Sequence, residues 1–187
     1  LLKRQRDAVG LSVYSNTYEF YAPEKGSDRH HRMITAQLEN LLSATPGNAT
    51  ETTRFLHQIA EKLKRRSLVF LFTDMFEAGS DTEVLFGALK HLRYNKHRVV
   101  LFHIIDNETE MALSFDNRPR RFVDVETGQQ VDLYAESVQA EYQKEVAAYF
   151  KSLRLQCAKY KITYLPIDIK ESLHQVMLSF LSARGKF

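Results

Sequence analysis

The chain has 187 residues, of which 44% are hydrophobic and 26% charged, enough for one globular domain with a hydrophobic core. No apolar run reaches the roughly 20 residues of a membrane-spanning helix, so we expect no membrane contact in this segment. The formal net charge is only +3, which argues against nucleic acid as a partner. The single cysteine, Cys157, cannot form an internal disulfide, and this favours a reducing, cytoplasmic location.

The N-terminal part predicts a β-hairpin followed by a helix. Val9–Tyr14 and Thr17–Tyr21 are short, rich in β-forming residues and separated by Ser15-Asn16, which is the spacing of a hairpin. Arg29–Leu42 then carries apolar residues at helical spacing. The sequence Thr-Pro-Gly-Asn at residues 45–48 predicts a loop after this helix.

From Glu51 onward, predicted helices and strands alternate. Strands are expected at Leu68–Phe72, Arg98–Ile105 and Ile162–Ile167, and helices at Glu51–Arg66, Asp81–Tyr94, Tyr134–Lys161 and Ser172–Ala183. The first strand is wholly apolar, which indicates burial on both faces. A small hairpin or irregular excursion, Phe122–Val125 and Gln130–Leu133, flanks Thr127-Gly128. This order predicts an α/β three-layer sandwich with a mostly parallel sheet and an antiparallel edge hairpin.

Each of the three predicted strands is followed by an aspartate: Asp74, Asp106 and Asp168. Ligands of open α/β sheets bind at the carboxyl ends of the strands, and carboxylates there suit a hard cation such as Mg²⁺. Thr50, in the loop before the helix that leads into the first strand, is a hydroxyl candidate for the same edge. The alternative is that each aspartate is a turn former or helix cap and that Thr50 caps its helix. For any one of these residues the cap is the favoured interpretation, and the agreement among three strands adds weight to a site.

Other kinds of site find little support in the sequence. It contains no His-Glu-x-x-His motif, no Cys/His metal spacing, no Gly-x-Ser-x-Gly elbow and no phosphate-binding glycine loop. Cys157 lies on an apolar helical stripe, which predicts a buried thiol rather than a nucleophile. The basic clusters at residues 90–98 and 118–121 are typical of solvated helix ends and loops.

Several segments together resemble a bacterial von Willebrand factor A (vWA)-like family of unknown function that is often encoded near MoxR-type AAA+ ATPases. The segments that carry the resemblance are Asp7–Tyr14, Gly47–Thr50, Leu63–Arg66, Leu68–Asp74, Ala88–Arg93, Val99–Asp106 and Arg121–Gly128. The resemblance implies a vWA-like, Rossmann-type fold. It also implies a metal-ion-dependent adhesion site built from an Asp-x-Ser-x-Ser motif, a threonine and an aspartate.

The resemblance assigns Thr50 and Asp74 to the last two elements of that metal site, with Thr52 and Thr53 as competing choices for the threonine. Asp106 is a candidate for the rim of the site or for a position behind the metal ligands. No Asp-x-Ser-x-Ser occurs in this sequence, and the family places that motif, with the central first strand of the sheet, upstream of Leu1. We therefore expect residues 1–187 to form a single vWA-like domain truncated at its N-terminus, with Mg²⁺ bound in the intact protein and none bound by this chain alone.

The function implied by the resemblance is a non-enzymatic protein–protein interaction module in which a partner's carboxylate completes the metal coordination. A MoxR-type AAA+ ATPase is the implied partner, in protein assembly or maturation. The alternative is a metal-assisted hydrolase or phosphoryl-transfer enzyme that uses Asp74, Asp106 and Asp168. A purely structural interaction domain without metal is a third reading. A sheet lacking its central strand has unpaired edges, which predicts self-association.

Overall fold

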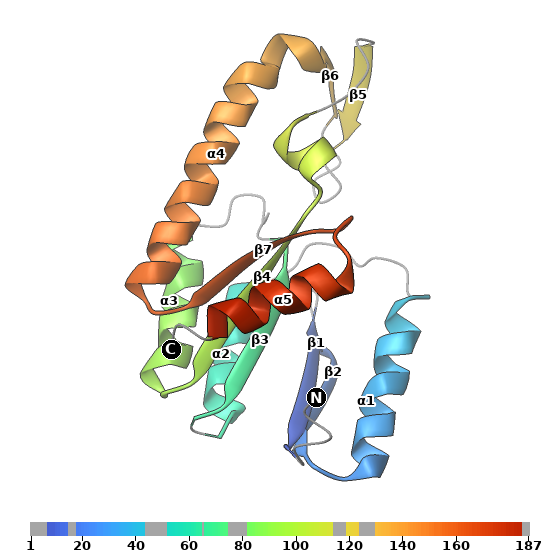
Figure 1. The fold of residues 1–187 in the computed structure, drawn as a ribbon, viewed down its shortest axis with the longest axis vertical. Helices are drawn as coiled ribbons and strands as arrows, with labels where there is room; N and C mark the ends of the chain where they lie inside the picture. The colour runs from blue at the N-terminus through green and yellow to red at the C-terminus, as the bar shows by residue number, and fades with distance from the viewer. Residues whose placement is uncertain are drawn as a thin grey trace. The chain divides into compact units, whose positions relative to one another are not determined.

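The computed structural model describes residues 7–14, 18–43, 52–64, 66–74, 82–113, 119–123 and 130–184. The chain forms two compact units, which we call the N-terminal unit (Leu1–Leu63) and the C-terminal unit (Lys64–Phe187). The ribbon in Figure 1 gives the elements of both units. Each unit is described by itself, and the single domain expected for residues 1–187 stays a prediction.

The N-terminal unit begins with an antiparallel hairpin, as predicted. Strand β1 (Val9–Tyr14) pairs with β2 (Tyr18–Lys25), which continues four residues beyond the predicted end. Val9 faces Lys25 whereas Leu11 faces Ala22, so β2 holds an extra residue next to Pro23, which has no N–H to donate. Opposite this bulge, a side chain at Gly10 would begin 2.8 Å from the Ala22 carbonyl oxygen, which explains the glycine.

Two helices complete the N-terminal unit. Helix α1 (Asp28–Leu41) starts at Ser27, whose side chain accepts a hydrogen bond from the His30 N–H. The buried ring of His30 donates from Nε2 to the Val9 carbonyl at 2.9 Å and thereby ties α1 to β1. Helix α2 (Thr52–Lys62) contacts the hairpin through Phe55, whose ring centroid lies 5.4 Å from that of Tyr14.

The end of α2 differs from the prediction, which extended this helix to Arg66. The helix ends at Lys62, which is the basic residue of its last turn. Arg66 has a φ of 67°, a left-handed conformation that a continuing α-helix excludes. The Ser67 hydroxyl donates to the Lys64 carbonyl at 2.7 Å, which stabilises the turn that leads into the next strand.

The C-terminal unit is built on a parallel three-stranded sheet, as the alternation of helices and strands predicts. Its order is β3 (Leu68–Thr73), β4 (Arg98–Ile105) and β7 (Thr163–Asp168). The helices that connect and follow these strands are α3 (Thr82–Tyr94), α4 (Ala135–Lys159) and α5 (Leu173–Arg184). The observed α/β class therefore agrees with the sequence. The β1–β2 hairpin forms a sheet of its own.

Alternate residues of β4 face helices on opposite sides of this sheet. Val100 and Phe102 pack with Phe180 of α5, which lies across the sheet in Figure 1. On the other side Ile105 packs with Val146 and Phe150 of α4. The C-terminal unit therefore has helices on both faces of its sheet. Within the described residues, no helix is both long enough and apolar enough to cross a membrane.

Strand β3 is less buried than its apolar sequence predicts. The exposed fractions of Leu68 and Phe72 are 40% and 62%, so burial on both faces was the wrong expectation. The physical reason is its place in the sheet, because β4 is its only neighbour among the described strands. The central strand β4, by contrast, is buried along most of its length.

An excursion separates β4 from α4. It starts with a short π-helical turn, η1 (Asn107–Met111), which the sequence pattern did not predict. Strands β5 (Pro119–Val123) and β6 (Gln130–Tyr134) then pair in antiparallel fashion, which confirms the predicted small hairpin. Gln139 and Tyr142 of α4 bind the backbone of this excursion, donating to the carbonyls of Ala112 and Glu110.

Candidate functional site

The candidate site is the carboxyl-terminal edge of the three-stranded sheet. Asp74 directly follows β3, Asp106 directly follows β4, and Asp168 is the last residue of β7. The strands run parallel, with Thr73 opposite His103 and Ile105 opposite Asp168. All three aspartates therefore belong to the same edge of the sheet, where α/β proteins bind ligands.

Asp106 caps the π-helical turn η1. Its Oδ1 accepts from the Glu108 N–H at 3.0 Å, and its own N–H donates to Oε2 of Glu110 at 2.9 Å. This reciprocal pair satisfies two backbone donors at the start of the turn, in the manner of a capping box. A hydrogen bond from the Thr109 side chain is the largest cause that lowers the pKa of Asp106, with smaller effects from backbone N–H groups and Lys170. The carboxylate is thus held ionised.

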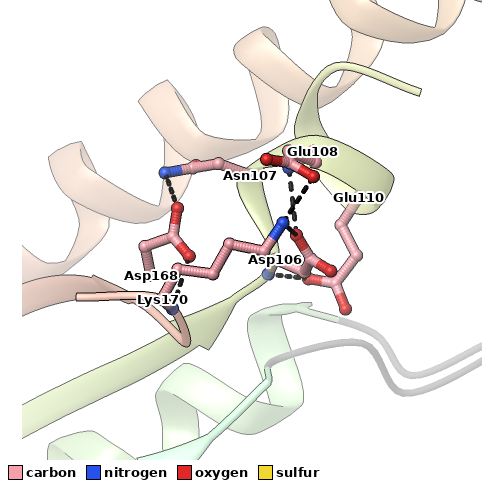
Figure 2. A network of polar contacts seen from close by, with 6 residues as sticks. All are labelled: Asp106, Asn107, Glu108, Glu110, Asp168 and Lys170. Atoms are coloured by element: carbon pink, nitrogen blue, oxygen red, sulfur yellow. Dashed lines mark hydrogen bonds and ion pairs between the residues drawn. The ribbon is translucent and has the colours of Figure 1, made fainter. Parts of the chain in front are cut away.

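Lys170 connects Asp106 with the turn after β7, as Figure 2 shows. Its Nζ lies 2.5 Å from Oε2 of Glu108 and 3.8 Å from Oδ1 of Asp106. The bond to Glu108 is the largest cause that raises the pKa of Lys170. The positive charge of Lys170 therefore lies between two carboxylates that would otherwise repel each other.

Two N–H donors of the same network bind the Asp168 carboxylate. The Asn107 amide donates to its Oδ2 at 2.6 Å, and the Lys170 backbone N–H donates to its Oδ1 at 2.8 Å (Figure 2). Both carboxylate oxygens of Asp168 thus accept N–H groups of the protein. The network of Asp106, Asn107, Glu108, Glu110, Asp168 and Lys170 joins the ends of β4 and β7 through contacts within the chain.

Asp74 is bound through its backbone. Its side chain is exposed, while its carbonyl oxygen accepts a 2.7 Å hydrogen bond from Nε2 of His103. The Asp74 carbonyl thus has a protein donor, and the Asp74 side chain is exposed at the edge of the sheet. The sequence analysis assigned no role to His103. The signal it overlooked is a single polar residue inside the apolar run of β4, because a buried polar group requires partners.

The described residues contain part of the expected site. Thr50, the expected hydroxyl ligand, lies outside the described residues. Thr53, a competing choice, lies on α2 in the N-terminal unit, and Thr52 is the first residue of that helix. Asp106 belongs to the edge, where it is joined to Lys170.

Comparison with known proteins identifies the family of the chain. The sequence model of DUF58, described as a protein of unknown function, matches residues 1–151. The chain belongs to this family. The match includes the first two strands of the parallel sheet, with Asp74, His103 and Asp106, and ends within α4. No curated protein and no solved structure matches this DUF58 chain.

The donor set of this DUF58 protein fits the expected magnesium site only in part. Mg²⁺ requires near-octahedral coordination by oxygen ligands. Among the described residues, there is no group of three or more His, Cys, Asp or Glu side chains that could hold a metal. Of the two residues assigned to that site, Asp74 is described and Thr50 is not. A magnesium site would therefore need further oxygen ligands.

The single cysteine of the DUF58 protein is buried, as the sequence predicts. The Cys157 side chain is fully inaccessible to solvent on α4. Burial raises the pKa of this thiol to about 12, so it is uncharged at neutral pH. A buried neutral thiol packs as a small apolar group and does not act as a nucleophile.

Proposed function

We propose that this DUF58 protein is a non-enzymatic protein–protein interaction module of the vWA type. The observation that carries the proposal is the exposed Asp74 side chain at the carboxyl-terminal end of β3. Two residues earlier, on β3, Phe72 exposes 62% of its surface. A carboxylate beside exposed apolar surface suits recognition of another protein, because apolar contact supplies affinity and the charge supplies direction.

The proposed interaction depends on metal in the intact protein. Asp74 and Thr50 would hold Mg²⁺ together with the Asp-x-Ser-x-Ser motif of the vWA type, which this sequence lacks. Magnesium supplies a positive centre that accepts a carboxylate from the partner. The oxygen chemistry of the Asp74 side chain supports this assignment, and the resemblance to vWA-like proteins supplies the remaining ligands.

The proposed partner is a MoxR-type AAA+ ATPase, and the proposed process is assembly or maturation of other proteins in the cytoplasm. This choice rests on the resemblance of segments such as Leu68–Asp74 and Val99–Asp106 to vWA-like proteins encoded near such ATPases. Membership of the DUF58 family, whose function is unknown, is compatible with it. The ATPase would provide the chemical energy, and this chain would provide recognition.

An enzyme that uses all three aspartates has less support. Metal-assisted hydrolysis or phosphoryl transfer needs carboxylates that turn toward a metal or a nucleophilic water. Asp106 instead caps η1 and faces Lys170, and both oxygens of Asp168 accept N–H groups. Recruiting them as ligands would break these contacts.

One experiment compares the two functions in the same preparations. The intact protein is tested for retention of a MoxR-type ATPase from the same genome and for turnover of p-nitrophenyl phosphate with Mg²⁺. We expect no turnover above the protein-free rate. We also expect retention that is lost in Asp74→Ala and kept in Glu171→Ala, which removes an exposed acid from the turn after β7. Turnover that is lost in both Asp106→Asn and Asp168→Asn would instead establish the enzyme.

A further inference from the structure

The His103 side chain connects all three strands of the parallel sheet. It lies on the central strand β4, and none of its surface is exposed. Its Nε2 lies 2.7 Å from the Asp74 backbone oxygen after β3, and its Nδ1 lies 2.7 Å from the Tyr164 hydroxyl on β7. The ring stacks on Phe150 of α4 with centroids 4.7 Å apart and planes 18° apart. The ring is thus fixed on its face and at both nitrogens.

The partners of His103 define which nitrogen carries the hydrogen. A carbonyl oxygen can only accept, so Nε2 must donate to Asp74. Burial lowers the pKa of His103 and raises the pKa of Tyr164, so the imidazole is neutral and the phenol keeps its hydrogen. Nδ1 of the neutral ring is then an acceptor, and the Tyr164 hydroxyl donates to it.

We infer that His103 is a positioning residue for Asp74. Its Nε2–H holds the backbone carbonyl of Asp74 in place and thereby fixes the direction in which the Asp74 side chain extends from the end of β3. This inference rests on the proposed function, because it assigns a role at the same site. A metal ion or a partner recognises a carboxylate in a defined direction, and hydrogen bonds from neighbouring groups supply that direction.

A purely space-filling role does not account for the geometry. An apolar residue at position 103 would suit the side of β4 on which Ile105 packs against Phe150 of α4. A histidine buried there carries two polar atoms, and both have partners at 2.7 Å, one on β7 and one directly after β3. Tyr164 accordingly orients the ring, the ring holds Asp74, and Phe150 prevents the ring from tilting.

The first test uses the unmodified chain. Long-range ¹⁵N–¹H correlation spectra of the histidine rings report which nitrogen of His103 is protonated. We expect a proton on Nε2, slow exchange of that proton with solvent, and an unprotonated Nδ1. A His103 ring that carries its proton on Nδ1 would overturn the inference, because Nε2 could not then donate to Asp74.

The second test separates the hydrogen bond from packing. In His103→Leu we expect amide exchange at Thr73 and Asp74 to rise about tenfold relative to Leu71, the factor that one buried hydrogen bond contributes. In His103→Gln the amide nitrogen replaces Nε2 as donor, and we expect exchange within about twofold of the original. His97→Leu is the control, because His97 is equally buried at the opposite end of β4. It should leave Asp74 unchanged.

Two outcomes of this comparison contradict the inference. One is an equal rise in amide exchange at Asp74 in His103→Leu and His97→Leu, which would indicate that both variants destabilise the whole sheet. The other is failure of His103→Gln to restore protection, which would make the ring's volume the relevant property. Should His103→Leu not fold, the glutamine variant and the ring spectra still decide the question. Failure of Asp74→Ala to weaken partner binding would refute the proposed function while leaving the His103 result intact.

Discussion

The Tyr164 hydroxyl lies 2.7 Å from Nδ1 of His103, and this contact joins β7 to the central strand inside the C-terminal unit. Both groups are largely or wholly buried, and burial raises the pKa of Tyr164 and lowers that of His103. The hydrogen bond therefore forms between two uncharged groups. This hydrogen bond stabilises the fold mainly by giving Nδ1 a donor, because a buried acceptor without a donor lowers the free energy of unfolding.

Removing the Tyr164 hydroxyl should therefore destabilise the protein without creating a large cavity. We expect Tyr164→Phe to lower the free energy of unfolding by about 1–3 kcal/mol, the cost of a buried acceptor left without a donor. Urea unfolding followed by circular dichroism measures it. Tyr160→Phe is the matched control, because the ring of Tyr160 stacks at 6.0 Å on Phe86 and that contact survives the change. A smaller effect for Tyr164→Phe than for Tyr160→Phe would contradict the assigned hydrogen bond.

The buried His97 predicts a loss of stability in mild acid. The Ser67 N–H donates to its Nδ1 at 3.2 Å, Nε2 has no hydrogen-bond partner among the described residues, and burial lowers its pKa. Its pKa in the unfolded chain is about 6.5. The neutral His97 ring therefore makes its full contribution to stability above pH 6.5. This contribution is lost as the pH falls through the lower pKa that His97 has in the folded protein.

The His97 prediction is measured by urea unfolding at several pH values between 7 and 5. His97→Asn retains an acceptor for the Ser67 N–H and removes the titrating ring. We expect the variant to be less stable at pH 7 but to lose less stability on acidification. Part of the dependence remains, because burial also lowers the pKa of His103. If the free energy of unfolding fell equally steeply with pH in both proteins, His97 would not contribute to the loss of stability in acid.

The contacts around Asp106 predict an order of effects on its pKa. The hydrogen bond from Thr109 is the largest cause of the lowered pKa, and the charge of Lys170 is the smallest. Thr109→Val should therefore raise the pKa of Asp106 toward its ordinary value by more than Lys170→Met does. Titration of the Asp106 carboxyl carbon by NMR measures both. The reverse order would mean that the ion pair, rather than the cap of η1, holds this carboxylate.

The elements themselves could largely be predicted from the sequence, whereas the site could be predicted only in part. Hydrophobic period and strand length were sufficient for the parallel sheet and for both hairpins. The end of α2 was missed because basic residues are equally compatible with a helix and with the turn at Arg66. The exposure of Phe72 was missed because an apolar run does not reveal whether its strand has one neighbour or two.

Contacts distant in sequence account for most of what was missed at the site. Asn107 binds Asp168, which lies 61 residues further along the chain, and no local pattern encodes that pair. Lys170 lies in the turn after β7, where a lysine is ordinary, and its role depends on the approach of Glu108. Asp74 and Asp106 could be named from sequence because an aspartate after an apolar strand has a predictable place. Their partners could not.

Among the described strands β3 pairs only with β4, and an unpaired edge predicts self-association of this chain. Strand β3 has no charged residue and exposes Phe72, whereas the other edge strand, β7, carries Pro166, which cannot donate to a further strand. We expect the mass from light scattering to rise with protein concentration. Phe72→Lys should abolish the rise, because a lysine on an edge strand opposes pairing. Ile169→Lys, which changes a similarly exposed apolar residue outside β3, should not. Equal effects of both variants would argue for general hydrophobic association.

The role of Asp74 in binding is tested most directly by a dissociation constant. The intact protein and a MoxR-type ATPase from the same genome are titrated by calorimetry in Mg²⁺ and again with EDTA. We predict that Asp74→Ala weakens binding about tenfold or more, as expected for a charge-assisted contact. EDTA should weaken binding by the unmutated protein to a similar extent. Glu171→Ala should bind as the original does. Binding by Asp74→Ala that equals that of Glu171→Ala would contradict the proposed function.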